Sequence, residues 1–405
     1  MKNIFPIKLD FKSLLLYAFV VLTVLFDNTE NTFYATFSFA LLLLFTISEM
    51  NKSAFNGLNL NILFPIWCFL SLIWSTNPTG GFTRATTCAI LTAVLVVFVI
   101  YSNKRDSSFV DSVLFVYVIG SLILSVMTYQ TMQNIGLLQM LAAVERLETD
   151  ILNLNMLGKY FAIAAVICIH FIVSKGKLVY YIPLAIFVFF VLLTKSRSSL
   201  LSLAIGAFFY LYYYYKGIGN LKRYWIIIAA IFAVLFMLSK LTVWGDAFIR
   251  FEGMFDFFTT NGNSGDYSTE MRDLYLRKGL ESIPESPIWG HGLGSVVDVM
   301  RRLVDSTMTV EDAYFHNNYV QIWSELGIIG FLLFYIPLYR IIKSLLKYTN
   351  DKNAVILLSI IIMFLFCDTN NTTYYHKIYY IFIGLCFFYI NAKRKENSIN
   401  KQIQV

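Results

Sequence analysis

Residues 85–101 read Ala-Thr-Thr-Cys-Ala-Ile-Leu-Thr-Ala-Val-Leu-Val-Val-Phe-Val-Ile-Tyr, without one charged side chain. Such a run is typical of a helix that crosses a lipid bilayer, because a helix satisfies its own backbone hydrogen bonds there. Similar runs recur along all 405 residues, of which 58% are hydrophobic and only 14% are charged. Soluble domains carry about 25% charged residues. The sequence therefore predicts an all-α polytopic integral membrane protein.

We predict about twelve transmembrane helices from these runs. They cover residues 13–26, 31–49, 60–74, 85–101, 109–129, 156–174, 178–194, 199–215, 224–239, 318–339, 353–367 and 378–390. Several are shorter than the ~20 residues that a perpendicular crossing needs, so each boundary is set only to within several residues. A further stretch at 135–144 is predicted to be re-entrant or a loop.

The distribution of positive charge predicts the orientation of these helices. One set of segments carries 19 Lys and Arg against 4 Asp and Glu: the two termini and residues 50–59, 102–108, 175–177, 216–223 and 340–352. Because loops rich in Lys and Arg stay in the cytoplasm, we expect both termini there and the long 240–317 loop outside. The net charge of +7 is attributed to contact with anionic membrane lipids, and no nucleic-acid partner is expected.

The sequence gives no sign of a metal or a cofactor. The five cysteines lie in or beside apolar runs without paired spacing, so neither a disulfide framework nor a metal site is predicted. The Gly-x-Gly-x-Gly at 290–294 follows no predicted strand, which a dinucleotide-binding turn requires.

The 240–317 loop resembles a small folded unit with short helices. It is acidic, with 7 Lys and Arg against 12 Asp and Glu. A Ser-Thr pair at 268–269 can cap a helix over about 269–282. The Trp-Gly-His-Gly-Leu-Gly at 289–294 predicts a turn that allows close backbone approach. Four residues fall on one face of the predicted helix: Arg272, Tyr275, Leu276 and Gly279.

Residues 315–331 read Phe-His-Asn-Asn-Tyr-Val-Gln-Ile-Trp-Ser-Glu-Leu-Gly-Ile-Ile-Gly-Phe and return the chain from the polar loop to an apolar run. His316 would lie at the membrane edge, and an ordinary imidazole pKa of ~6.5 suits it to take a proton from a hydroxyl. A second interpretation is that His316 or Asn317 caps the following helix. Glu325, in the apolar part, must face a partner or the bundle interior.

Positive residues on the predicted outer side go against the charge rule. Lys195 and Arg197 occupy a tight connection, where they either reach lipid headgroups or, for Arg197, face a bound anion. Arg272 has the alternative of a surface ion pair. Arg146 is a further external arginine close to a span. Lys159, about one turn inside its span, could snorkel outward or contribute to an anion site.

Three segments together resemble the O-antigen ligase and O-antigen polymerase superfamily of bacterial envelope glycan transferases. They are Thr-Lys-Ser-Arg-Ser-Ser-Leu-Leu-Ser-Leu-Ala-Ile-Gly at 194–206, Met271-Arg272 with the later Ser-Pro-Ile-Trp-Gly-His-Gly-Leu-Gly at 286–294, and His316-Asn-Asn-Tyr with Glu325-Leu-Gly-Ile-Ile-Gly. We expect three regions: N-terminal transmembrane helices at 1–150, a ligase- or polymerase-like core at 151–345 that includes the external loop, and C-terminal helices with a basic cytoplasmic tail at 346–405.

This resemblance implies a glycosyltransferase in the bacterial inner membrane, with the large loop in the periplasm and an undecaprenyl-pyrophosphate-linked glycan as donor. Arg197 and Arg272 would bind the donor pyrophosphate. His316 would be the base on the acceptor hydroxyl, in an inverting transfer that needs no metal. Further residues are expected to support the site: Arg146, Lys195, Asn317 and Glu325.

Polymerase and ligase differ in the acceptor that the resemblance implies. A polymerase extends another lipid-linked glycan, with a chain-length regulator as a further partner, whereas a ligase uses lipid A–core. The Arg146…Asn-x-Asn-x-x-Gly pattern is similar to polymerases, so polymerisation of O-antigen or related repeat units is the preferred hypothesis and ligation the alternative. A flippase for lipid-linked oligosaccharide is a third hypothesis, although the sequence lacks the internal repeat typical of transporters.

Overall fold

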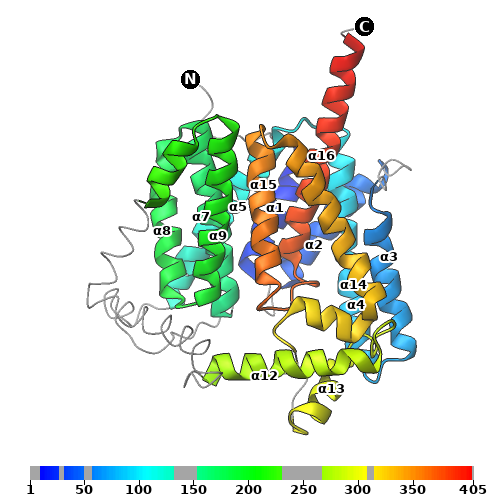
Figure 1. Cartoon of the computed structure of the whole chain (residues 1–405). Coiled ribbons are helices and arrows are strands. Elements are labelled where there is room, and N and C mark those ends of the chain that lie inside the picture. Colours follow the sequence, from blue (N-terminus) through cyan, green and yellow to red (C-terminus); the bar gives the residue numbers. More distant parts are fainter. Residues whose placement is uncertain are drawn as a thin grey trace, which may run out of the picture.

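The computed structural model describes residues 10–26, 32–49, 57–131, 153–229, 267–307 and 314–403. Within these ranges every regular element is a helix, as predicted, and most of the helices form one bundle (Figure 1). The α-helices are α1 (Phe11–Phe26), α2 (Thr32–Ile47), α3 (Asn59–Leu70), α4 (Pro78–Ser102), α5 (Phe109–Thr131), α7 (Leu154–Lys175), α8 (Tyr181–Leu193), α9 (Arg197–Gly217), α12 (Tyr267–Ser282), α13 (Val296–Leu303), α14 (Asn318–Leu345), α15 (Lys352–Cys367) and α16 (Lys377–Ile403). Short 3-10 turns add η2 (Ser71–Ile73), η3 (Leu178–Tyr180), η5 (Ile283–Glu285) and η6 (Leu346–Tyr348).

Helices cover eleven of the twelve predicted spans in the described part of the chain. The twelfth, 224–239, is helical as far as residue 229 and otherwise lies outside the described residues, as does the predicted segment 135–144. Among the described helices, four are long and apolar enough to cross a membrane: α4, α5, α7 and α14 with η6. Five further apolar helices are shorter. The protein is therefore a helical membrane protein, and the count of twelve spans stays a prediction.

Several ion pairs connect neighbouring segments at one end of the bundle. Lys104 after α4 contacts Glu49 after α2 at 2.6 Å, and Lys393 of α16 contacts Asp351 before α15 at 2.9 Å. This end, called the basic end, contains the connections at 48–49, 103–108, 176–177, 218–220 and 346–351. All of them except 48–49 belong to segments that the charge rule assigns to the cytoplasm. The helices α12 and α13 lie at the opposite end, where α12 runs across the bundle (Figure 1).

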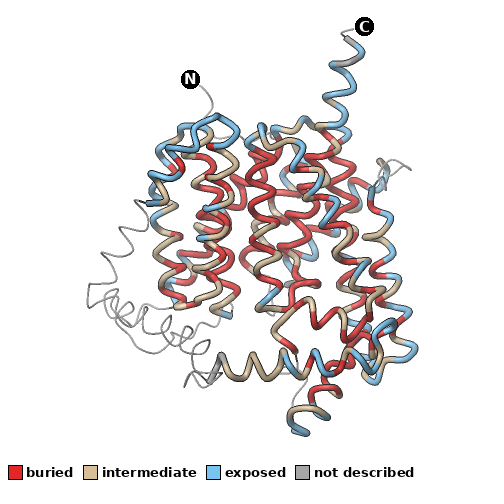
Figure 2. Tube along the Cα trace, viewed as in Figure 1, coloured by how far each residue is buried: buried red, intermediate tan, exposed pale blue. Residues whose placement is uncertain are grey.

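Buried residues fill the middle of the bundle, and exposed ones concentrate at its ends and outer face (Figure 2). Among the four long helices, α7 is the most deeply buried. It packs against α5, α8, α9 and α15. Lys159 of α7 is thus removed from both water and lipid, whereas Lys175 at the end of this helix is exposed.

A break at Gly327 divides α14 into two pieces. Gly327 has φ 66° and ψ −174°, which lie outside the helical range. A Cβ atom at this position would lie 2.0 Å from the carbonyl oxygen of Ile288, so only glycine fits. On the other side of the break, the N–H of Ile328 donates to the carbonyl of Pro287 at 2.9 Å. The 287–290 turn therefore inserts into the helix backbone.

The glycine turn at 289–294 satisfies the carbonyls that this break leaves open. The N–H of His291 donates to the carbonyl of Ser324 at 2.9 Å, and the N–H of Gly292 donates to that of Glu325 at 2.8 Å. The indole N–H of Trp67 donates to the carbonyl of Leu326 at 2.9 Å. The predicted close backbone approach is confirmed, and the turn locks the first piece of α14 onto the rest of the bundle.

Candidate functional site

The predicted face of α12 packs on the start of α14. The helix spans Tyr267–Ser282, two residues longer at its beginning than predicted. Gly279 lies so close that a Cβ atom there would be 2.5 Å from Val320 and 2.9 Å from the ring of Phe315. One helical turn earlier, Tyr275 contacts His316. The shared face thus turns Arg272 toward the segment that carries the histidine.

His316 is held between two aromatic rings. Its imidazole lies 5.7 Å from the ring of Tyr275, nearly parallel at 11°, and 3.9 Å from the ring of Tyr314. The side chain is partly buried, and its ring nitrogens make no hydrogen bond within the part of the chain that the structure describes. Both nitrogens therefore stay available to a bound molecule.

Asn317, and not His316, caps α14. Its side-chain oxygen accepts the N–H of Val320 at 3.1 Å, and its amide donates to the carbonyl of Thr369 at 3.2 Å. The capping interpretation thus applies to Asn317. His316 has a φ of 52°, a left-handed conformation that is uncommon for a residue with a side chain.

Positive charge surrounds the histidine. Burial, together with the charges of Arg272 and Lys159, lowers the pKa of His316 to about 3. The imidazole is therefore neutral at pH 7. The two predicted residues Arg272 and His316, which lie on separate elements, share one electrostatic environment. Lys159 of α7 acts on the same imidazole. The sequence predicts that this lysine either snorkels outward or contributes to an anion site.

Lys195 and Arg197 lie in the turn between α8 and α9. Ser196 is the N-cap of α9, and Arg197 is its first residue. A cation here opposes the positive end of the helix dipole, so an anion bound at this N-terminus would stabilise the arrangement. Lys195 has φ 49°, so Lys195 and His316 are the two non-glycine residues with positive φ in the described ranges. Strained backbone of this kind is often found at functional sites.

The start of α9 packs directly on the start of α7. The hydroxyl of Ser199 donates to the carbonyl of Asn155 at 3.1 Å. A Cβ atom on Gly158 would lie 2.5 Å from the same hydroxyl oxygen. The turn that carries Arg197 is therefore held against the turn of α7 that carries Lys159.

Glu325 is the centre of a buried network. Its carboxylate accepts hydrogen bonds from Arg84 at 3.0 Å, the N–H of Gly294 at 2.9 Å, Gln321 at 2.8 Å and Tyr374 at 3.2 Å. The expectation that Glu325 needs a partner is confirmed, and the partner is Arg84. Because it precedes the break at residue 327, Glu325 belongs to the end of the bundle and not to the middle of a span.

The side chain of Gln321 connects this network to the histidine segment. The amide of Gln321 donates to Glu325, and its oxygen accepts the N–H of Phe315 at 3.0 Å. Glu325 can therefore fix the backbone next to His316 without touching the histidine.

The connection between α15 and α16 is a part of this end that the sequence did not single out. Asn318 donates its N–H to the carbonyl of Asp368 at 2.7 Å and accepts the N–H groups of Thr373 and Tyr374 at 2.9 and 3.1 Å. Burial raises the pKa of the Asp368 carboxyl to about 7. The only signal in the sequence was a short polar run, Asp-Thr-Asn-Asn-Thr-Thr at 368–373.

Two predictions about the site remain, one on Arg146 and one on a metal ion. Arg146 is outside the described residues. Where side chains are described, no group of three or more His, Cys, Asp or Glu could hold a metal ion.

These observations define a class of protein. It is a helical membrane protein whose unusual polar residues meet at one end of the bundle. Residues 182–335 match the family model described as O-antigen ligase. The predicted resemblance to the O-antigen ligase and polymerase superfamily is thus confirmed over this segment, which is less than half of the chain. It includes both the turn with Arg197 and the segment with His316. A match to this family implies an enzyme that transfers a glycan.

A second comparison gives a short similarity. A segment of 121 residues is 28% identical to an uncharacterized protein of Haemophilus influenzae and covers 27% of this chain and 30% of that protein. The chain therefore matches less than a third of the length of this relative, which adds no information on the reaction.

Proposed function

We propose that this protein transfers a glycan from a polyprenyl-diphosphate donor to an acceptor hydroxyl. The observation that carries the proposal is the approach of Arg272, Lys159 and His316, from α12, α7 and the start of α14, at one end of a membrane bundle. Two cations next to a neutral imidazole suit a reaction in which a diphosphate leaves and a hydroxyl loses a proton.

In this mechanism the acceptor oxygen attacks the anomeric carbon from the side opposite the diphosphate. The bond from this carbon to the phosphate oxygen breaks, the configuration inverts, and the hydroxyl proton moves to a ring nitrogen of His316. Arg272 and Arg197 bind the departing polyprenyl diphosphate, because a guanidinium offers a planar pair of donors to phosphate oxygens. No step requires a metal ion or a nucleotide sugar.

The acid–base balance depends on the order of binding. With a pKa of about 3, His316 is unprotonated but a weak base. A bound diphosphate neutralises the positive charge of Arg272 and Lys159, which raises the pKa of the imidazole. We therefore propose that the base becomes effective only after the donor has bound.

The acceptor divides the proposal into two hypotheses. The Arg146…Asn-x-Asn pattern favours polymerisation, yet Asn153 of this pattern caps α7 and accepts the N–H of Asn155 at 2.9 Å, which is a structural role. The description of the matching family favours ligation to lipid A–core. The flippase hypothesis has no support from either comparison.

Deletion of the gene, followed by gel analysis of lipopolysaccharide, tests the function and separates these hypotheses. Single-repeat chains would indicate a polymerase, and loss of the whole chain with accumulation of lipid-linked polymer would indicate a ligase. An unchanged pattern would contradict both. Purified protein in liposomes with a lipid-linked glycan then tests the chemistry, with release of the polyprenyl diphosphate as the measured product.

A further inference from the structure

Lys159 is a buried cation. It is only 4% exposed, and its ammonium nitrogen makes no hydrogen bond to any residue that the structure describes. It lies in the second turn of α7, inside the most buried of the long helices. An unpaired charge away from water is strongly unfavourable. Either a structural anion compensates this ammonium, or a ligand does.

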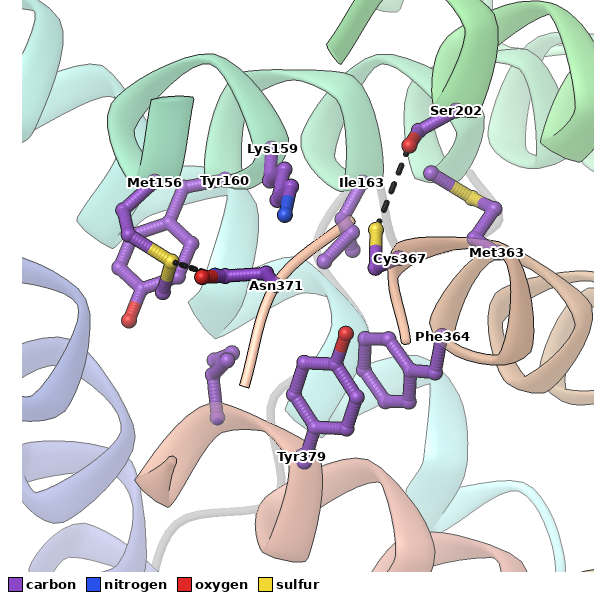
Figure 3. Close-up of a pocket in the computed structure, with 11 residues that line it drawn as sticks. Met156, Lys159, Tyr160, Ile163, Ser202, Met363, Phe364, Cys367, Asn371 and Tyr379 are labelled. Atoms are coloured by element: carbon purple, nitrogen blue, oxygen red, sulfur yellow. Dashed lines mark hydrogen bonds between the residues drawn. The ribbon is translucent and has the colours of Figure 1, made fainter. Parts of the chain in front are cut away.

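The ammonium points into a small pocket. Figure 3 shows Lys159 directed into a space between α7, α9, α15 and α16, with Asn371 at its side. Tyr379 also lines this pocket, and within the described ranges its buried hydroxyl likewise makes no hydrogen bond. The space holds about one water-sized sphere. It can therefore admit a single oxygen atom but not a whole phosphate group.

The carboxylate of Asp368 already forms hydrogen bonds with other residues. The charge of Asp368 acts on Lys159, but its carboxylate accepts hydrogen bonds from Tyr335 and Thr373, and it forms none with the lysine. The charge of Arg272 also acts on Lys159. Because both cations act on the same region, an anion with more than one charge, such as a diphosphate, is favoured there over a single carboxylate.

We propose that Lys159 binds one oxygen of the donor diphosphate from inside the bundle, as a third cation beside Arg272 and Arg197. This inference rests on the proposed function. One phosphate oxygen enters the pocket between Lys159 and the Tyr379 hydroxyl. The remaining diphosphate lies toward Arg272 and His316, and the prenyl chain extends away into lipid. The buried lysine therefore sets how deeply the diphosphate lies relative to the base.

The test compares Lys159→Met with Lys216→Met in the full chain, purified in nanodiscs of phosphatidylcholine. Lys216 is an exposed lysine at the basic end of α9, so its replacement is a matched control. Thermal unfolding is followed with farnesyl diphosphate, inorganic pyrophosphate or farnesol added. We expect farnesyl diphosphate to bind wild type and the control alike, and to bind Lys159→Met at least tenfold more weakly. Farnesol, which has no charge, should affect the unfolding temperature of all three proteins equally. Lys159→Arg should recover part of the affinity.

The measurement without ligand separates binding from a structural role. If the ammonium lacks a partner in the free protein, Lys159→Met unfolds at the same or a higher temperature than wild type. A marked decrease would mean that Asp368 or another group compensates the lysine, which would overturn the proposal. A second result would also overturn the proposal. If phosphatidylglycerol alone stabilises wild type but not Lys159→Met, the site binds a lipid headgroup.

The two levels of the proposal fail in different ways. If wild type does not bind farnesyl diphosphate, the proposed donor is wrong and the role of Lys159 with it. If wild type binds and Lys159→Met binds equally well, only the assignment of Lys159 is wrong, and the transfer reaction with its arginines stands.

Discussion

The ring of Tyr275 lies almost parallel to the imidazole of His316, with 5.7 Å between the ring centroids and 11° between the planes. Tyr275 belongs to α12, three residues after Arg272, whereas His316 precedes α14. Because residues three apart share a helix face, this contact aligns the arginine as well as the histidine. One aromatic stack thus joins the two halves of the proposed site.

Replacement of Tyr275 tests this alignment. Tyr275→Phe keeps the stacked ring and should retain near wild-type activity. Tyr275→Ala loses an aromatic contact worth about 0.5–1.5 kcal/mol, which corresponds to roughly a 2- to 12-fold loss of kcat/KM if the stack positions the base. Equal losses in the two variants would instead assign the effect to the Tyr275 hydroxyl. Steady-state transfer by the purified variants is the measurement.

His316→Gln tests the base itself. Glutamine is close in size but cannot take the proton, so we expect kcat to fall by about 10²- to 10⁴-fold. Binding of farnesyl diphosphate should persist, because the cations remain. Full transfer activity of this variant in liposomes would eliminate His316 as the base.

Arg197→Lys tests whether the first residue of α9 binds the donor through its planar fork of donors. A lysine keeps the charge but loses the paired geometry, so affinity for farnesyl diphosphate should decrease about tenfold. Arg340→Lys, at an exposed position of α14 near the basic end, is the matched control and should bind as wild type. Equal binding by both variants would mean that Arg197 only contacts lipid headgroups.

The sequence was sufficient for elements with a strong local signal. The helix ending before Ile283 and its face with Arg272 followed from helical spacing, and they recur in α12. The role of Glu325 did not follow, because its partner Arg84 is 241 positions away in the chain and no local pattern indicates such a pairing. Glycine spacing predicted a close approach at 289–294 but not that the turn enters a broken helix at Gly327.

The count of spans shows the other limit of the sequence. Hydropathy marks apolar runs, but α3 contains only 12 residues and continues as the single turn η2. A run of this length is apolar whether it crosses the bilayer or stops short of it. Lys159 shows the same limit, since burial and the absence of a partner depend on four different helices.

Glu325→Ala should destabilise the protein more than it affects the chemistry. The change leaves Arg84 without its carboxylate in a largely buried position, a loss of about 3–5 kcal/mol. The double variant Arg84→Met/Glu325→Leu removes both charges and should recover part of the thermal stability. Additive losses in the double variant would contradict a direct buried pair. Unfolding temperatures in nanodiscs provide the comparison.

The final prediction concerns proton binding by His316. Its folded pKa of about 3 lies below the ordinary value of 6.5, so between these values the unfolded chain binds a proton that the folded protein does not. The contribution of His316 to stability is therefore complete above pH 6.5 and is lost as the pH falls toward 3. Arg272→Gln should raise the folded pKa of His316 and so narrow the pH range over which this stability is lost.

Histidine-selective isotope labelling makes this proton directly measurable, because the chain contains only four histidines. The His316 signal, assigned by its absence in His316→Gln, should stay that of a neutral ring at pH 5 in the free protein. Farnesyl diphosphate should shift its titration to higher pH, because the bound anion opposes the charges of Arg272 and Lys159. In Lys159→Met, the pKa of His316 should already be raised without ligand. Binding of farnesyl diphosphate should then shift it less than in wild type. An unchanged titration with bound diphosphate would show that the anion lies too far from the imidazole for the proposed transfer.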